Sequence, residues 1–168
     1  NAIVDVIAEV DDKFLSELAL EKGNMTLIDD IHMAQLEDKL RSAPKKIMSG
    51  GSAANTVFAV QAFGGSTAYA CKISNDRNGK HFFRDFSDSG ISMSNSSIVK
   101  EGATGQCLVL VTPDAERTMA TNLGVSANLT NSCIDEKTLH ESKTLYLEGY
   151  LATSEKNTRV ALQAREIA

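Results

Sequence analysis

The sequence has no tryptophan, little proline and few cysteines, and it contains no long basic or apolar run. Its 168 residues include two prolines and three cysteines, Cys71, Cys107 and Cys133. An odd number of widely spaced cysteines in apolar or helical surroundings favours reduced thiols in a core over a disulfide framework. No apolar run approaches the roughly 20 residues of a membrane span, and no signal-peptide pattern opens the chain. We therefore predict a cytoplasmic protein without a membrane partner.

The charges are mixed and do not gather in runs of one sign. Lys and Arg number 17 against 22 Asp and Glu, which gives a formal net charge of -5. No basic cluster reaches the length that attracts a polyanion, so the composition argues against a nucleic-acid partner. The length suits one domain better than two.

Both ends of the sequence lie inside regular patterns. The chain opens without methionine in the apolar run "NAIVDVIAEV". It closes in the helical pattern "NTRVALQAREIA", which has no Gly or Pro at its end to stop a helix. We therefore expect the sequence to be part of a longer protein.

Strand and helix patterns alternate along the chain, which predicts the α/β class with βαβ units and a largely parallel sheet. The early short strands and the hairpin do not fit inside such units and are predicted to form a small flanking sheet. The predicted strands are 2–10, 23–29, 63–74 and 144–151, the last of them buried, with a hairpin at 105–124 that turns at Pro113 and Asp114. The predicted helices are 30–41, 76–90 and 133–143, one that opens at Ala53 after Ser52 as N-cap, and a last one capped by Ser154.

Three polar features fall where ligands bind in open α/β sheets, just outside the carboxyl ends of the strands. Asp5 follows the first strand, and Glu148 ends the run "TLYLE". The pair Gly50 and Gly51 opens a helix that carries Asn55 in its first turn. Two carboxylates and one amide suit a polyhydroxylated ligand such as a sugar or a ribose ring.

Each of these features also has a purely structural explanation. Asp5 could simply end a strand in solvent, and Asn55 could bond to local backbone. The glycine pair could be a tight turn that lets a helix start close to a strand. Glu148 is harder to explain in this way, because an acid in a buried strand needs a partner or a cleft.

The spacing of the residues argues against three other kinds of site. The glycine turn lacks the P-loop lysine and the G-x-G-x-x-G spacing, so it is a weak candidate for a nucleotide-phosphate loop. The three histidines, His32, His81 and His140, lie on separate predicted helices and are not paired at ligand spacing, which argues against zinc. No nucleophile-elbow sequence occurs either.

Six strings in a fixed order give the sequence a family resemblance. They are "NAIVD", "SGGSAANT", "FGG", "DRNGKHF", "TGQCLVLVTPDAERTMATNLG" and "YLEGYL". Along nearly all of its length the chain resembles the N-terminal half of the ribokinase-like (pfkB) carbohydrate and nucleoside kinases, and it looks most like the adenosine-kinase-like branch. The resemblance implies a three-layer, Rossmann-like fold with a mostly parallel central sheet and a small β-sheet lid, at approximately 6–29 and 91–121, in a truncated domain spanning 1–168.

The resemblance also implies roles for individual residues. Asp5, Gly50, Gly51 and Asn55 match the positions that hold the hydroxyls of the sugar or ribose acceptor. The further substrate-binding positions that it implies are Asn1 and Ser52 near the same ligand, Arg117 toward the phosphoryl region, Glu148 toward a sugar hydroxyl, and Tyr150 with Ile3 and Met25 on the apolar side.

Five of these residues have alternative explanations. Glu148 matches ribokinase-like members, whereas adenosine kinases tend to have an apolar or small residue there, so sugar acceptors remain open. Arg117 could equally be a surface arginine beside a turn. Core packing is the alternative for Ile3, Met25 and Tyr150.

The motifs that are missing define the expected activity. The family's catalytic base belongs to a C-terminal Gly-Ala-Gly-Asp motif, and an Asn-x-x-Glu stretch is associated with Mg²⁺; neither occurs here. The resemblance therefore implies an ATP- and Mg²⁺-dependent kinase of a nucleoside or sugar, of which this chain carries the acceptor-binding part, without catalytic or metal-binding residues and inactive alone. A homodimer through the lid is implied as possible. The alternatives are a sugar kinase of the ribokinase or fructokinase type and a non-catalytic ligand-binding fragment.

Overall fold

A computed structural model describes residues 1–168 and shows strands and helices in alternation. The strands are β1 (Ile3–Glu9), β2 (Met25–Leu27), β3 (Lys45–Gly50), β4 (Ile73–Ser74), β5 (Ile98–Val99), β6 (Gly105–Val111) and β7 (Arg117–Asn122). The α-helices are α1 (Asp12–Glu17), α2 (Asp30–Lys39), α3 (Ser52–Ala62), α4 (Arg77–Asp88), α5 (Glu136–Glu141) and α6 (Glu155–Ile167). No helix combines the length and the apolar character that crossing a membrane requires.

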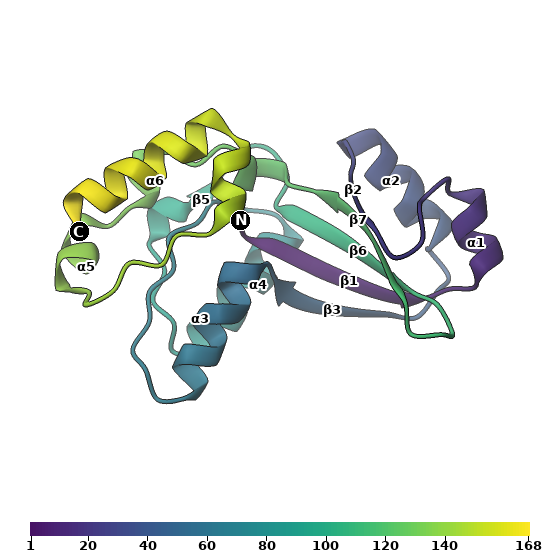
Figure 1. Cartoon of the computed structure of the whole chain (residues 1–168), viewed down its shortest axis with the longest axis horizontal. Helices are drawn as coiled ribbons and strands as arrows, with labels where there is room; N and C mark the ends of the chain where they lie inside the picture. The colour runs from purple at the N-terminus through teal and green to yellow at the C-terminus, as the bar shows by residue number, and fades with distance from the viewer.

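The strands form two sheets. The larger has five strands in the order β2-β7-β6-β1-β3, and the smaller pairs β4 with β5. Three of the five pairings are parallel, namely β1 with β6, β2 with β7 and β4 with β5. In Figure 1 the five-stranded sheet reaches toward α1 and α2, whereas α3, α5 and α6 gather at the end of the molecule where the C-terminus lies. The α/β class predicted from the sequence is confirmed.

The hairpin of β6 and β7 forms as the sequence predicted. Its strands pair antiparallel, and the turn between them contains Pro113, whose fixed φ suits a turn. The Thr112 N–H donates to the Glu116 carbonyl at 3.0 Å, and the Ala115 N–H donates to the Thr112 carbonyl at 2.8 Å. Ala115 has a φ of 66°, in the left-handed region where glycine is usual.

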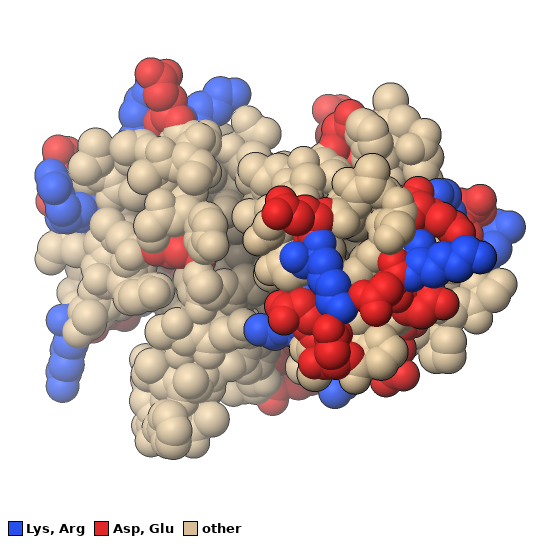
Figure 2. Space-filling view, turned by 45° about the vertical axis from the view of Figure 1, so that its right-hand side comes forward, with Lys and Arg blue, Asp and Glu red and all other residues tan.

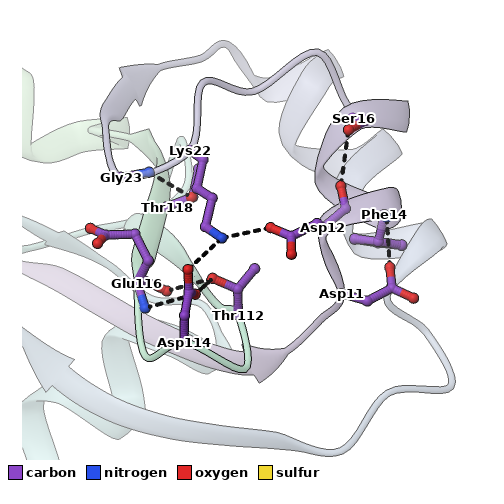
Figure 3. A network of polar contacts seen from close by, with 10 residues as sticks. All are labelled: Asp11, Asp12, Phe14, Ser16, Lys22, Gly23, Thr112, Asp114, Glu116 and Thr118. Atoms are coloured by element: carbon purple, nitrogen blue, oxygen red, sulfur yellow. Dashed lines mark hydrogen bonds and ion pairs between the residues drawn. The ribbon is translucent and has the colours of Figure 1, made fainter.

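A polar network holds the loop before β2 against this turn (Figure 3). The Lys22 ammonium lies 2.6 Å from Asp12 Oδ1 and 2.7 Å from Asp114 Oδ2, so it joins α1 to the hairpin. One residue further on, the Gly23 N–H donates to Thr118 Oγ1 at 3.0 Å. The network thus ties α1 and the loop that follows it to a turn 92 residues further along the chain.

Helices α1, α2, α3 and α4 pack on one face of the five-stranded sheet. A core cluster of 19 buried residues joins Val4 and Val6 of β1 to Leu15 of α1 and Leu36 of α2. The aromatic rings of Phe82 and Phe86 on α4 stack in the same cluster, with their centroids 4.4 Å apart. Phe83, on the same helix, is only half-buried.

The opposite face of the sheet carries a small cluster to which no helix contributes. Its buried members are Ile3, Cys107 and Val109, and half-buried side chains of β1, β6 and β7 pack around them. We call this the Asp5 face. Side chains two residues apart in a strand point to the same face, so Asp5 lies on the same face of β1 as Ile3 and Ile7.

Three local predictions are wrong. Residues 144–151 form no strand: the backbone of 143–147 makes no hydrogen bond, and Gly149–Thr153 is a 3₁₀ helix, because no neighbouring strand pairs with this segment. The strand predicted within 63–74 is reduced to β4 and an isolated bridge between Ala68 and Ser92. Ser52 is not the N-cap, since α3 already begins there and Gly51, with a φ of 101°, takes the cap position without a side-chain bond.

Candidate ligand-binding site on the Asp5 face

Asp5 lies inside β1 and not after its end as the sequence predicted, because the strand continues to Glu9. The strand register places it fourth in a row of side chains that crosses all five strands. Partners in adjacent strands point to the same face of a sheet, so the register defines rows of neighbouring side chains. The row through Asp5 is Leu27, Thr121, Cys107, Asp5 and Met48, in the order of the strands. The next row is Met25, Met119, Val109, Ile7 and Lys46. A row that contains Asp5 and Thr121 therefore lies beside a row that is apolar except for Lys46.

The glycine pair shapes the end of this face. A Cβ built on Gly50 would overlap the Asp5 carboxylate, so only glycine lets the carboxylate lie against the backbone of β3. A Cβ on Gly51 would lie 2.6 Å from the Asn1 carbonyl oxygen, and Gly51 also has a positive φ of 101°. The glycine pair is therefore a tight turn, which is the structural explanation considered in the sequence analysis. The same turn brings the start of β1 and the Asp5 carboxylate against the start of α3.

Asp5 lies in an environment that disfavours its charge. Its side chain is half-buried in the middle of the sheet, and burial raises the pKa of the carboxyl above its ordinary value. The positive charge of Arg117 lowers the pKa in part through its field. A carboxylate kept out of water gains more from a hydrogen bond to a ligand hydroxyl than an exposed one does.

Glu148 lies beside Asn1, although the strand predicted to carry it does not form. Its Oε2 atom lies 3.2 Å from the Asn1 backbone nitrogen, and only 9 % of the residue is exposed. The Tyr69 hydroxyl donates to the Asn1 carbonyl at 3.1 Å. The Oδ1 atom of the Asn1 side chain is buried without a hydrogen-bond partner, so its acceptor capacity is unused within the chain.

The remaining predicted residues differ in how they are placed. Ser52 and Asn55 lie exposed in the first turn of α3, next to Gly51. The Asn55 backbone N–H donates to the Gly51 carbonyl at 2.9 Å, whereas its side-chain amide makes no hydrogen bond within the chain. Arg117 begins β7, on the Asp5 face but away from the row of Asp5. Tyr150 is 55 % exposed in the 3₁₀ helix that follows Glu148. Neither Arg117 nor Tyr150 makes a side-chain hydrogen bond or an ion pair with the residues around Asp5.

Sequence reasoning missed the two side chains that flank Asp5 in its row, Met48 and Cys107. The Thr121 hydroxyl donates to Cys107 Sγ at 3.3 Å, and burial raises the pKa of this thiol to about 11. Side chains of a strand point alternately to its two faces, so Cys107 and Val109 in "GQCLVLV" share one face. The spacing of two residues could therefore have placed Cys107 on the Asp5 face. It could not have identified the register that puts Cys107 beside Asp5.

A separate hollow lies behind Glu148. This groove, of about 870 Å³, lies between α3 on one side and α5 and α6 on the other, with residues 142–148 along it. Most of its lining is apolar, including Val57, Leu145 and Leu147. No group of three or more His, Cys, Asp or Glu side chains that could hold a metal ion gathers in the chain.

Comparison with known proteins gives a consistent result. The sequence profile of the "pfkB family carbohydrate kinase" family matches residues 25–168. Adenosine kinase 2 of Arabidopsis thaliana is 26% identical over 131 residues, which are 75% of this chain and 37% of that protein. Guanosine-inosine kinase of Escherichia coli K12 is 27% identical over 157 residues, which are 90% of this chain and 36% of that protein.

Two solved structures resemble the whole chain. The crystal structure of adenosine kinase from Sinorhizobium meliloti has a TM-score of 0.88 and 34% identity, and the match covers 100% of this chain and 51% of that one. The structure of a probable sugar kinase from Rhizobium etli CFN 42 has a TM-score of 0.90 and 32% identity, with 100% and 50% covered. The chain thus spans just over a third of the curated relatives' length and about half of the solved structures.

Proposed function

This chain belongs to the pfkB family of carbohydrate kinases, and from that premise we propose that the complete protein is an ATP-dependent kinase of the cytoplasm that phosphorylates a hydroxyl group of a nucleoside. In this proposal the chain carries the acceptor-binding part. Two relatives named for nucleosides, an adenosine kinase and a guanosine-inosine kinase, support the substrate class.

The observation that carries the proposal is the pairing of two rows on the Asp5 face. Asp5 supplies an acceptor for ribose hydroxyls, and Gly50 leaves the carboxylate reachable along the backbone of β3. One row away, Ile7, Val109 and Met119 offer an apolar surface. The strands of Asp5 and Met119 are two spacings apart, roughly 10 Å. A polar end and an apolar end at this separation suit a ribose joined to a flat base better than a lone sugar.

Each residue of the proposed site has a binding or orienting role. Asp5 accepts hydrogen bonds from ribose hydroxyls, and the amides of Asn1 and Asn55 orient the ligand from the ends of β1 and α3. Holding the acceptor in one orientation is the contribution of this chain to the reaction. ATP and Mg²⁺, when bound by the complete protein, supply the phosphoryl group and neutralise its charge. The segments 6–29 and 91–121 are proposed as the lid that excludes water, and a second copy of the chain as a partner at the lid.

A sugar acceptor is the second candidate, and Glu148 favours it. This buried acid beside Asn1 matches the position that reaches a sugar hydroxyl in ribokinase-like members. A non-catalytic ligand-binding fragment is the remaining alternative.

Phosphorylation by the complete protein tests the proposal. The assay would offer adenosine, guanosine and inosine against ribose and fructose at equal concentration, with ATP and Mg²⁺. We expect a nucleoside to be phosphorylated with the highest kcat/KM. Faster phosphorylation of ribose or fructose would show that the protein is a sugar kinase instead. If no acceptor is phosphorylated, the kinase proposal is wrong and the non-catalytic ligand-binding fragment is the alternative that remains.

A further inference from the structure

Sulfur-bearing side chains are concentrated on the Asp5 face. The chain has five methionines and three cysteines, and four of these eight side chains lie in the two rows described above. They are Met25, Met48, Cys107 and Met119. Met48 and Cys107 are the direct cross-strand partners of Asp5, so the carboxylate lies between a thioether and a thiol.

The sulfur groups beside Asp5 differ in exposure. Met48 is 42 % exposed on the edge strand β3, whereas Cys107 is 6 % exposed inside the sheet. Met25 is as exposed as Met48, at 43 %, but it lies on β2 at the opposite edge. Met48 is therefore the sulfur that is both next to Asp5 and open to a dissolved reagent.

The two neighbours of Asp5 also differ in reactivity toward a peroxide. A thiol reacts as its thiolate, and a thiol with a pKa of about 11 remains protonated at neutral pH. A thioether needs no deprotonation. Its sulfur takes one oxygen atom from a hydroperoxide and is oxidised by two electrons, and the peroxide is reduced to water or to the alcohol. Met48 should react before Cys107.

We propose that Met48 is a hydroperoxide-sensitive modification site at which sulfoxide formation weakens ligand binding on the Asp5 face. The proposal rests on the proposed function, because it concerns the same site. The sulfoxide places a polar oxygen beside a carboxylate that is already poorly solvated and is needed for the ligand's hydroxyls. A ligand that binds there must displace the water held by this oxygen, which costs binding free energy. The change is reversible, because methionine sulfoxide reductases restore the thioether.

Calorimetry before and after hydrogen peroxide treatment tests the proposal on the full chain. Adenosine affinity would be measured for the unmodified chain, Met48→Leu and Met93→Leu, and sulfoxide at each methionine would be quantified by mass spectrometry. We expect peroxide to weaken adenosine binding about tenfold in the unmodified chain and in Met93→Leu, and to leave the affinity of Met48→Leu at its untreated value. Met93→Leu is the control, because Met93 is half-buried in the lining of the groove and belongs to neither row of the Asp5 face.

Other results would overturn the proposal in distinguishable ways. If Met48 sulfoxide forms and adenosine binds as tightly as before, the regulatory role is wrong while the nucleoside site stands. If Met93→Leu rather than Met48→Leu protects the affinity, the modification site has been misplaced. If the untreated chain and the complete protein bind no nucleoside, the proposed function fails and this inference fails with it.

Discussion

Asp5 combines a binding role with a cost to stability. Burial raises the pKa of its carboxyl above the ordinary value of 3.8, so over the interval between the unfolded and folded pKa values the folded chain holds a proton that the unfolded chain has released. Stability therefore falls as the pH rises through that interval. At neutral pH the charged group is a net cost to the fold, as expected of a residue kept for binding.

Replacing Asp5 by Asn should therefore stabilise the chain at neutral pH. We expect the thermal midpoint of Asp5→Asn to exceed that of the unmodified chain at pH 7 and to converge with it in acid, where Asp5 is protonated. The matched control is Asp38→Asn on the exposed surface of α2, where changes within about 0.5 kcal/mol are usual. A lower midpoint for Asp5→Asn at pH 7 would contradict this account.

Ala115 is held in a conformation that suits glycine. Its φ of 66° lies in the left-handed region, where an L-residue with a side chain pays roughly 1 kcal/mol. Ala115→Gly should therefore raise the free energy of unfolding by about 0.5–1 kcal/mol, measured by urea denaturation. The same change at Ala34, inside α2, should lower it by about 1 kcal/mol. If both substitutions change the free energy of unfolding in the same direction, the explanation is wrong.

At the scale of the element, the Lys22 network joins α1, the loop before β2 and the β6–β7 turn (Figure 3). Its groups are exposed, so the expected contribution is small and sensitive to salt. Bonds from Lys22 and Thr112 lower the pKa of Asp114 from 3.8 to about 2. The resulting stability is present above the unfolded value and is lost as the pH falls from about 4 toward 2.

Lys22→Gln should weaken this connection without unfolding the sheet. We expect faster hydrogen exchange at the Gly23 amide, which donates to Thr118, and a smaller loss of stability between pH 4 and 2 than in the unmodified chain. Lys13→Gln, on the exposed face of α1, is the control because Lys13 forms no ion pair. Unchanged exchange at Gly23 in Lys22→Gln would show that the network does not hold the loop.

Elements with local signals could be predicted from the sequence. The β6–β7 hairpin follows from two apolar runs and the turn at Pro113, and α4 follows from the spacing of Phe82 and Phe86. The segment 144–151 was predicted wrongly, because its composition suits a strand but strand formation needs a partner that composition cannot show.

Some residues of the candidate site could be identified from the sequence, and others could not. Asp5, Gly50 and Gly51 were singled out from a predicted strand end, a glycine turn and the family motifs, although Asp5 lies inside β1 and not after its end. The contact between Asn1 and Glu148 was not predicted, because it joins residues 147 positions apart in the sequence. Met48 and Cys107 were missed because their neighbourhood with Asp5 depends on pairing between strands that lie about 40 and 100 residues away along the chain.

For the whole molecule, the distribution of charge is uneven. Figure 2 shows Lys, Arg, Asp and Glu crowded on the side that comes forward and an almost uncharged surface over much of the rest of the view. The sequence from Ile47 to Cys71, which includes α3, contains no charged residue. Exposed apolar side chains beside the groove include Val60 at 46 % and Leu147 at 40 %. Apolar surface of this kind usually marks an interface.

The groove should make the 168-residue chain self-associate. We expect strong 1-anilinonaphthalene-8-sulfonate fluorescence and a sedimentation coefficient that rises with concentration. Leu147→Ser, in the groove lining, should reduce both, whereas Leu27→Ser, at 58 % exposure on β2, should leave the dye signal unchanged. A monomeric chain with one cooperative unfolding transition at high temperature would contradict this expectation.

The central claim is that the Asp5 face binds a nucleoside, and calorimetry tests it most directly. Adenosine and ribose would be titrated into the 168-residue chain, into Asp5→Asn and into the control Asp38→Asn. The account predicts that adenosine binds more tightly than ribose, and that Asp5→Asn weakens adenosine binding at least about tenfold, since a hydrogen bond to a charged group contributes about 1.5–3 kcal/mol. Adenosine binding that is equally tight in Asp5→Asn and in the unmodified chain would contradict the claim.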